Sequence, residues 1–370
     1  MHIKSTRTFT PILFVYLARK FFVSIFVTTL ILVGIVTLLD FMELTRRLGD
    51  KAVDTASVAT EMLLLKMPDQ ILQLTPFAIL IGTLICFAKL TRNHELIVIR
   101  ASGVPARNFL IAPFIVCLGI GLFNLFVLSP FSSTTLKTYQ KVEARVFPGS
   151  ASGFLTEGGH IWLRQDDHDK NLLIYAKNVL DNGRRLGDAS VFVTEKSGKF
   201  INRIDTPNMR LRTGKWLIDT PLIIKPGQPM EKATSFELPT TLTPETIRNS
   251  FTSPRTLNLW ELEAFIEKLE NTGFPTQNHE MQWQKLISSP ALVIAMFLIA
   301  APFSLQFSRH QGMTKMVMIG VAFGFAFYFF TNFISAFGIA GGIDIMLAAW
   351  LPTVIAGLLG LSLFIHFREE

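Results

Sequence analysis

The chain has 370 residues, of which 49% are hydrophobic, and its mean hydropathy is +0.40. Only 17% of the residues are charged, below the roughly 25% of ordinary soluble domains, which argues against a soluble globular protein. The net charge of +7 partly reflects cations beside apolar segments and is no evidence for binding to nucleic acid.

Six uncharged stretches each approach or exceed the ~20 residues that cross a hydrocarbon core. A soluble protein could bury one such helix but hardly six, so the sequence predicts an α-helical integral membrane protein. The first stretch is not expected to be a cleavable signal peptide, because no small-x-small site separates it from the charged segment 40–47. We expect transmembrane helices at about 20–40, 63–89, 106–129, 285–307, 315–337 and 344–366, within an N-terminal half at 1–136 and a C-terminal half at 281–370.

The cations of the short loops predict the orientation. They flank the first span on its N-terminal side, join the second span to the third and the fourth to the fifth, and follow the sixth. With six spans these places share one side, so both termini are expected in the cytoplasm and the large insert in the periplasm. The cations are Lys4, Arg7, Arg19, Lys20, Lys89, Arg92, Arg100, Arg107, Arg309, Lys315 and Arg368.

A second cationic group, Arg46, Arg47 and Lys51, lies just past the outer end of the first span. One interpretation is a solvated collar in which Arg46 pairs with Asp50 at i,i+4. The other is a cationic rim that faces an anionic group at the outer leaflet.

The segment NHELIVIRASGVP, 93–105, predicts a short cytoplasmic helix at about 93–102. Asn93 is a suitable N-cap, and Glu95 lies in the first turn, where the helix dipole favours an anion. Leu96 and Ile99 form an apolar side, and the closing Gly-x-Pro ends the helix. The helix either rests on lipid or docks as a coupling helix into a cytoplasmic ATPase, with Glu95 offered to a basic group.

The insert, 137–255, is long enough for a domain of its own. Short segments rich in β-branched and aromatic residues alternate with turn signals, which predicts a β-sandwich or jelly roll, with a plain meander as the alternative. The insert has no cysteine, and Cys86 and Cys117 fall in predicted spans as packing residues. The expected strands cover 161–163, 172–176, 189–194, 199–204, 209–212, 216–218 and 222–224.

A connecting segment, 256–280, is expected to contain an amphipathic helix that links the β domain to the fourth span. Asn258 and Glu261 are spaced as a capping pair at its start. Composition alone leaves the insert open as a binding module or an inert spacer. The apolar face consists of Leu259, Leu262, Phe265, Ile266 and Leu269.

Motifs for catalysis are absent from the sequence. It has no GxxxxGK[ST] to bind ATP phosphates, no HExxH to bind zinc and no GxSxG. Asp40, Lys66 and Asp69 lie near the outer ends of predicted spans, where ionisable groups cost little, so a proton relay is not indicated. The sequence therefore predicts no enzyme, no cofactor and no metal site, and energy for transport would come from a partner.

Four stretches resemble the permease subunits of the lipopolysaccharide-export ABC transporter, the LptF/LptG family. The most specific is HELIVIRASG, and the plan of six spans with a large insert after the third also agrees. Between the two subunits, the ASG ending and the FGFAFYF stretch are more similar to the G subunit. The stretches are HELIVIRASG at 94–103, TPFAILIGTL at 75–84, GVAFGFAFYFF at 320–330 and LAAWLPTVIAGLLG at 347–360.

The resemblance implies an inner-membrane protein that pairs with a paralogous LptF-like permease over an LptB-like cytoplasmic ATPase dimer. Lipopolysaccharide would enter a cavity between the two permeases from the outer leaflet. It would then pass to a periplasmic β-jelly-roll, an LptC-like single-span subunit and an LptA-like bridge.

The resemblance also implies roles for three groups of residues. Asp40 and Asp69 depart from the family resemblance, because the resemblance leads us to expect further cations at these outer ends of the first two spans. Arginine suits a phosphate contact because the charge-assisted hydrogen bond is strong. For each aromatic residue, core packing is the alternative. The groups are Glu95, Leu96, Ile99 and Arg100 for ATPase coupling; Arg46, Arg47 and Lys51 for lipopolysaccharide phosphates; and Phe26, Phe77 and Phe325 for the cavity.

A second hypothesis is a structural or signalling membrane protein whose β domain binds a partner without moving lipid. The helix at 93–102 discriminates between the two. Replacing Glu95 is expected to weaken ATPase docking or uncouple hydrolysis only if this helix is a coupling helix.

Overall fold

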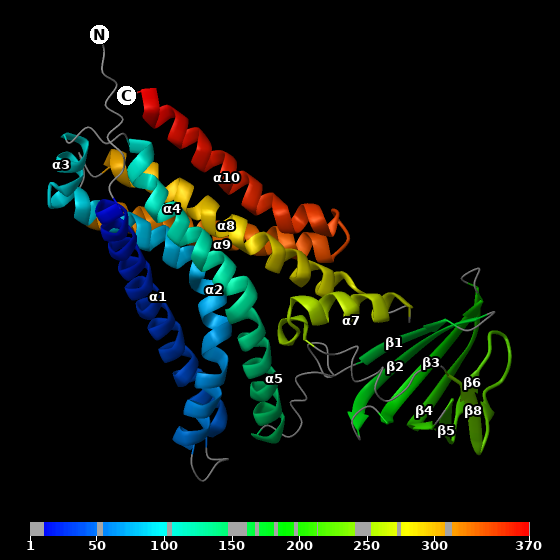
Figure 1. The fold of residues 1–370 in the computed structure, drawn as a ribbon. Helices are drawn as coiled ribbons and strands as arrows, with labels where there is room; N and C mark the ends of the chain where they lie inside the picture. The colour runs from blue at the N-terminus through cyan, green and yellow to red at the C-terminus, as the bar shows by residue number, and fades with distance from the viewer. Residues whose placement is uncertain are drawn as a thin grey trace. The chain divides into compact units, whose positions relative to one another are not determined.

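The computed structural model describes residues 11–49, 55–101, 106–146, 161–166, 170–180, 184–195, 199–212, 214–240, 253–271, 275–307 and 313–369. The chain divides into two compact units, a helical unit and a β-rich unit that contains most of the insert (Figure 1). Each unit is considered by itself below.

Six described helices are long and apolar enough to cross a membrane, which confirms the predicted membrane-protein class. They run beyond the predicted spans because hydropathy marks only the part of a helix that crosses hydrocarbon. The spans are α1 (Pro11–Leu48), α2 (Thr55–Arg92), the run of α4 (Ala106–Phe123), η2 (Asn124–Leu128) and α5 (Ser129–Val146), then α8 (Gln277–Phe307), α9 (Met313–Ile339) and α10 (Ile345–Glu369).

Two predicted boundaries of the insert differ from the structure. The helix of the third span continues to Val146, so the boundary at 137 falls within α5. At the other end α8 begins at Gln277, inside the segment expected to connect the insert to the fourth span. The last turns of α5 and the first turns of α8 are polar, and hydropathy alone does not assign polar turns to a span.

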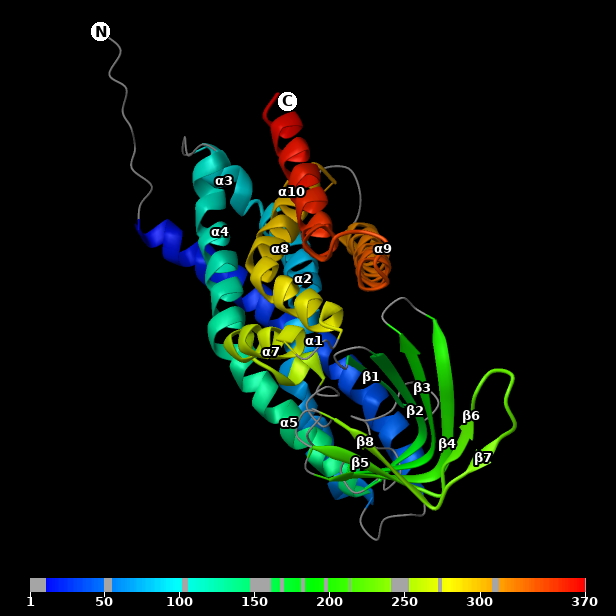
Figure 2. The same ribbon diagram turned by 90° about the vertical axis from the view of Figure 1, so that its right-hand side faces the viewer.

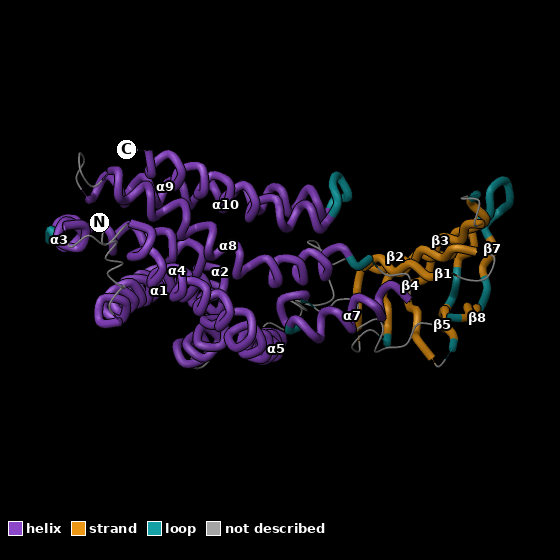
Figure 3. The backbone as a smooth tube through the Cα atoms, turned by 45° about the horizontal axis from the view of Figure 1, so that its top comes forward, coloured by secondary structure: helices purple, strands orange, loops and turns teal. Residues whose placement is uncertain are grey.

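The helical unit is built around α2 and α8. In the most apolar 18-residue stretch of each helix, 61% of the residues are buried in α2 and 50% in α8. The corresponding share is 17% in both α1 and α9. Helix α2 contacts both α1 and α9, and these two helices lie apart from one another (Figures 2 and 3). Cys86 and Cys117 are buried in the unit. The faces of α1 and α9 that point away from α2 are therefore largely uncovered apolar surfaces, and α4, η2 and α10 also expose apolar side chains.

Helices α8 and α10 are in close contact at Gly360. A Cβ atom there would lie 2.7 Å from the Cβ of Leu298 and 2.8 Å from its carbonyl carbon. On the same helix, a Cβ at Gly357 would meet nothing within 4 Å. The α8–α10 contact thus requires glycine at one of these two positions and not at the other.

The described residues of the β-rich unit form an antiparallel eight-stranded sheet, which confirms a β domain between the third and fourth spans. Its order is β1-β2-β3-β4-β5-β8, with β6 beside β4 and β7 beside β6. Trp216 is fully buried in its core, and the strands are visibly curved (Figure 2). The strands are β1 (Ile161–Asp166), β2 (Lys170–Leu180), β3 (Arg185–Glu195), β4 (Phe200–Arg212), β5 (Lys215–Asp219), β6 (Leu222–Ile224), β7 (Glu231–Lys232) and β8 (Ser235–Pro239).

Strand β4 joins the segments 199–204 and 209–212, which the sequence predicts as separate strands. Pro207 lies opposite Asp188 of β3, where the ladder skips one pair and Asp188 adopts a φ of 48°. The strand changes its second neighbour there, from β6 to β5. Proline has no backbone N–H, so a strand tolerates it where pairing is interrupted.

The connecting helix is α7 (Leu259–Asn271), and its predicted capping pair is confirmed. Asn258 Oδ1 accepts the backbone N–H of Glu261 at 2.9 Å, and the Glu261 carboxylate accepts the N–H of Asn258 at 3.2 Å. Phe265 and Leu269 pack against the core of the sheet. The apolar face of α7 therefore packs on the β domain, and the helix also links this domain to the fourth span.

Candidate functional site

The short helix after α2 is α3 (Glu95–Ala101), and its start differs from the prediction. The carbonyl of His94, which has a φ of 59°, accepts the first helical hydrogen bond, from the N–H of Val98 at 3.1 Å. Asn93 is therefore not the N-cap; its side-chain amide instead donates to the Glu95 carboxylate at 3.4 Å. The helix has seven residues and is shorter than the predicted 93–102.

The Glu95 carboxylate is held by two side chains of α1. Lys20 Nζ donates to Oε1 at 2.6 Å and to Oε2 at 2.8 Å, and the Tyr16 hydroxyl donates to Oε2 at 2.8 Å. The Lys20 ammonium also lies 4.7 Å from the Tyr16 ring centroid. Tyr16 and Lys20 are one helical turn apart, so they share a face of α1. Both oxygens of Glu95 therefore have donors within this chain.

These contacts favour the ionised form of the Glu95 carboxyl. The hydrogen bond from Lys20 is the largest cause that lowers the pKa of the Glu95 carboxyl from its ordinary value of 4.5. Because the pKa is lowered in the folded protein, the contact contributes its full stabilisation above pH 4.5. This stabilisation is lost as the pH falls through the lowered pKa of the folded protein. The link between α1 and α3 is therefore fully formed at neutral pH.

The apolar residues of α3 face the helical unit. Leu96 and Ile99 are buried in its main hydrophobic cluster, whereas Val98 is 66% exposed. The side chain of Arg100 lies outside the described part of the structure. Figures 1 and 2 place α3 at the end of the unit where α10 also ends. The exposed surface of α3 therefore includes Val98, while Leu96 and Ile99 seat the helix.

At its other end, α1 carries Arg46 and Arg47 in its last turn, both exposed. Arg46 pairs with Glu43 one turn back, at 2.8 Å. Asp50, its partner in the solvated-collar interpretation, and Lys51 lie outside the described residues. The two arginines thus stand together at the end of α1.

Asp40 belongs to a polar network between α1 and α2. Its Oδ2 accepts Lys66 Nζ at 2.6 Å and Gln70 Nε2 at 2.7 Å, and Thr37 donates to Gln70 Oε1 at 3.0 Å. Asp40 departs from the cations that the family resemblance implies at such positions. In the structure Lys66 of the neighbouring helix neutralises its charge.

The three predicted cavity aromatics lie on three different helices, α1, α2 and α9. Phe26 of α1 is 53% exposed, Phe325 of α9 is 64% exposed, and Phe77 of α2 is half-buried. The Phe77 ring packs against Tyr328 of α9, with centroids 6.0 Å apart. Phe77 thus helps join α2 to α9, whereas Phe26 and Phe325 project from the two uncovered helices.

Residues 15–366 match the family model for the lipopolysaccharide export system permease LptF/LptG. The chain belongs to the LptF/LptG family. It is 22% identical over 347 residues to the permease protein LptG of Haemophilus influenzae, covering 92% of this chain and 94% of that protein. It is also 22% identical over 366 residues to LptG of Escherichia coli strain K12, covering 96% and 98%. The resemblance seen in the sequence is confirmed.

Membership of the LptF/LptG family identifies the chain as a permease subunit of lipopolysaccharide export. Together with the six apolar helices, it makes the chain a multi-pass inner-membrane protein. The family supplies the cargo, which neither the composition nor the helix pattern specifies.

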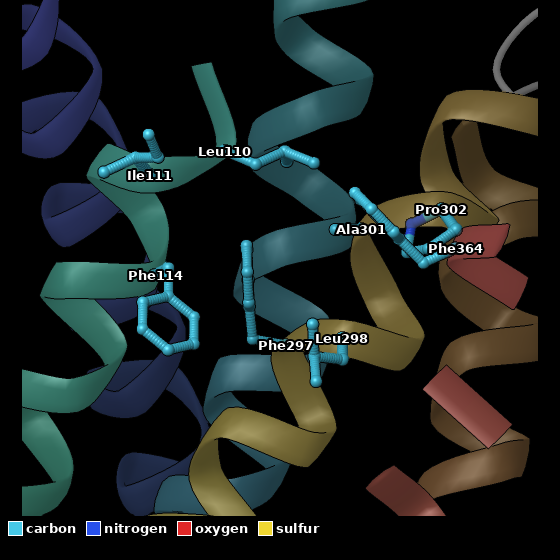
Figure 4. A pocket seen from close by; sticks show the side chains of 8 residues that line it. All are labelled: Leu110, Ile111, Phe114, Phe297, Leu298, Ala301, Pro302 and Phe364. Atoms are coloured by element: carbon cyan, nitrogen blue, oxygen red, sulfur yellow. The ribbon is translucent and has the colours of Figure 1, made fainter. Parts of the chain in front are cut away.

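This LptF/LptG permease also has an apolar pocket of about 190 Å³ between α4, α8 and α10. Figure 4 shows Phe114 and Phe297 on facing sides of it. None of its lining side chains carries a hydrogen-bonding group, so the pocket suits hydrocarbon and not a polar ligand. The lining residues are Leu110, Ile111, Phe114, Phe297, Leu298, Ala301, Pro302 and Phe364.

Proposed function

We propose that the chain is the membrane subunit of an ATP-driven ABC transporter. It extracts lipopolysaccharide from the outer leaflet of the inner membrane and passes it towards a periplasmic bridge. The observation that carries the proposal is the family match over residues 15–366, in a chain whose α1 and α9 leave apolar faces uncovered. The subunit itself is non-catalytic, and a separate ATPase hydrolyses ATP.

The partners follow from the same proposal. A paralogous LptF-like permease covers the exposed faces of α1 and α9, and the space between the two permeases receives the acyl chains. Phe26 and Phe325 line that space, and Phe77 supports it from α2. An LptB-like ATPase dimer binds on the cytoplasmic side, where the termini and α3 lie. An LptC-like single-span subunit and an LptA-like bridge continue the route.

Arg46 and Arg47, with Lys51, contact the phosphates of the lipid at the outer leaflet. The two guanidinium groups lie exposed in the last turn of α1 and offer several donors in fixed geometry. The surface pair between Arg46 and Glu43 is weak enough to be exchanged for a phosphate, because exposed ion pairs contribute about 0–1 kcal/mol.

The double replacement Arg46→Glu with Arg47→Glu tests this site. We expect lipopolysaccharide-stimulated ATP hydrolysis by the reconstituted complex to fall at least fivefold, because two anions now face the phosphates. Assembly of the complex should persist, as judged by co-purification.

Glu43→Gln is the matched control. It removes the partner of Arg46 and leaves both arginines in place, so stimulation should remain or increase. Stimulation of the double variant equal to that of the unmodified complex would contradict the site.

A further inference from the structure

We propose that the apolar pocket between α4, α8 and α10 binds one acyl chain of a phospholipid from the cytoplasmic leaflet of the membrane. The inference rests on the orientation in the proposed function, which places both termini in the cytoplasm. It gives the subunit a lipid site that is separate from the space that receives the cargo.

The depth of the pocket is the first support. Leu110 and Phe114 follow Arg107 in α4 by ~5 and ~10 Å, at a helical rise of about 1.5 Å per residue. Phe364 of α10 precedes Arg368 by ~6 Å. Half of the hydrocarbon core of a membrane is ~15 Å thick. The pocket therefore lies at the depth of the acyl chains, on the side that the cations of the short loops assign to the cytoplasm.

The second support is the size and chemistry of the pocket. Its volume is about 190 Å³, and its eight lining side chains are all apolar. A cavity of about 150 Å³ that is lined by leucine, isoleucine and phenylalanine stays dry and binds benzene. By this comparison the pocket holds a segment of about six to eight carbon atoms, which is part of one acyl chain.

The third support is the side on which the pocket opens. Ile111 and Phe114 are 46% and 37% exposed, whereas Phe297 and Ala301 of α8 are buried. A chain from the surrounding lipid thus enters past α4 and reaches the wall formed by α8 (Figure 4). Neither α1 nor α9, whose faces are proposed to meet the partner permease, contributes a lining residue. The mouth of the pocket is therefore left to the bilayer.

A bound chain would join three helices at the cytoplasmic end of the helical unit. Leu298 of α8 is in close contact with Gly360 of α10, and it lines the pocket together with Phe364, one turn after Gly360. A chain seated there contacts α4 on one side and α8 and α10 on the other. A phospholipid supplies this chain, because the lipopolysaccharide of the proposed function enters from the opposite leaflet.

Lipid photocrosslinking tests the site in the complex of both permeases and the ATPase, reconstituted in proteoliposomes. The probe is a phosphatidylethanolamine with a diazirine in the middle of one acyl chain, and mass spectrometry maps the adducts. We expect at least fivefold more adduct at Phe297 than at Phe87 of α2. These two phenylalanines are equally buried, at 2% and 1% exposure, and only Phe297 lines the pocket.

Ala301→Leu fills the pocket from α8 and should lower the adduct at Phe297 at least fivefold. The adduct at Ile115, which is exposed on α4, should stay within twofold. Ala300→Leu is the matched control, because Ala300 is equally buried and does not line the pocket. In detergent without phospholipid, Ala301→Leu should melt no lower than the unmodified chain, whereas Ala300→Leu should melt lower because it overpacks the core.

Equal adducts at Phe297 and Phe87 in the unmodified complex would overturn the proposal, and this comparison needs no variant. An adduct at Phe297 that folded Ala301→Leu leaves unchanged would also overturn it. So would displacement of the probe by lipopolysaccharide as effectively as by unlabelled phosphatidylethanolamine, since the pocket would then hold cargo. Failure of the proposed function has a different signature, because this labelling requires neither ATP nor release of lipopolysaccharide.

Discussion

Replacing Asp40 by leucine is expected to lower the stability of the helical unit by about 2 kcal/mol. The change leaves the Lys66 ammonium without its carboxylate at the contact between α1 and α2. Removing one member of a buried ion pair costs roughly 3–5 kcal/mol. The smaller value is expected here because the Asp40 and Lys66 side chains are 27% and 34% exposed. The measurement is the thermal unfolding midpoint in detergent.

The double variant Asp40→Leu with Lys66→Met is the control for this prediction. Replacing both charges by apolar groups removes the unpaired ammonium, so most of the lost stability should return. If the double variant melts as low as Asp40→Leu, the loss does not come from an uncompensated Lys66. An unchanged midpoint for Asp40→Leu would show that the network does not hold α1 to α2.

Replacing Gly360 by valine is expected to separate α8 from α10 and to cost about 3 kcal/mol, the upper part of the range for overpacking. The first added atom would lie 2.7 Å from Leu298 Cβ and 2.8 Å from a backbone carbon, so the helix and not only a side chain must shift. The unfolding midpoint of the purified protein should fall by several degrees, and the yield of folded protein should fall with it.

Gly357→Val is the matched control, because it makes the same change three residues earlier on α10, where a Cβ meets nothing within 4 Å. Helix propensity changes equally in the two variants, so their difference reports packing alone. Equal midpoints for the two variants would contradict the close α8–α10 contact.

Local patterns were enough to predict several features. Hydropathy located the six membrane helices, because a run of apolar residues suffices to identify a span. The capping pair of Asn258 and Glu261 was readable because its partners are three residues apart. The resemblance carried by the 94–103 segment and three other stretches supplied the family, which the whole-chain match confirms.

Contacts between distant residues were not predictable. Lys20 and Tyr16 bind a carboxylate that is 75 and 79 residues away, and no local pattern reports such a partner. Lys66 likewise lies 26 residues from Asp40. A sequence can therefore place these charges on helices without showing which of them are neutralised.

The faces of the membrane helices were also beyond the sequence. A transmembrane helix is apolar on all sides, so periodicity does not distinguish the packed side from the exposed side. Phe77 and Phe325 look alike in the sequence, yet Phe77 packs against Tyr328 and Phe325 is exposed.

The continuity of β4 was not predictable either. The ladder between β3 and β4 skips the pair of Asp188 and Pro207, and this interruption allows β4 to continue through a proline.

Photocrosslinking at position 325 tests the central claim most directly, which is that ATP hydrolysis drives lipopolysaccharide through a space lined by α9. A benzophenone amino acid replaces Phe325 in one variant. In the control variant it replaces Leu358 of α10, which is similarly exposed, at 62% against 64%. Both are reconstituted with the partner permease, the ATPase and lipopolysaccharide. We predict a lipopolysaccharide adduct at least fivefold stronger at 325 than at 358, which declines when ATP is added. Equal adducts at the two positions, or an adduct at 325 that ATP does not change, would contradict the account.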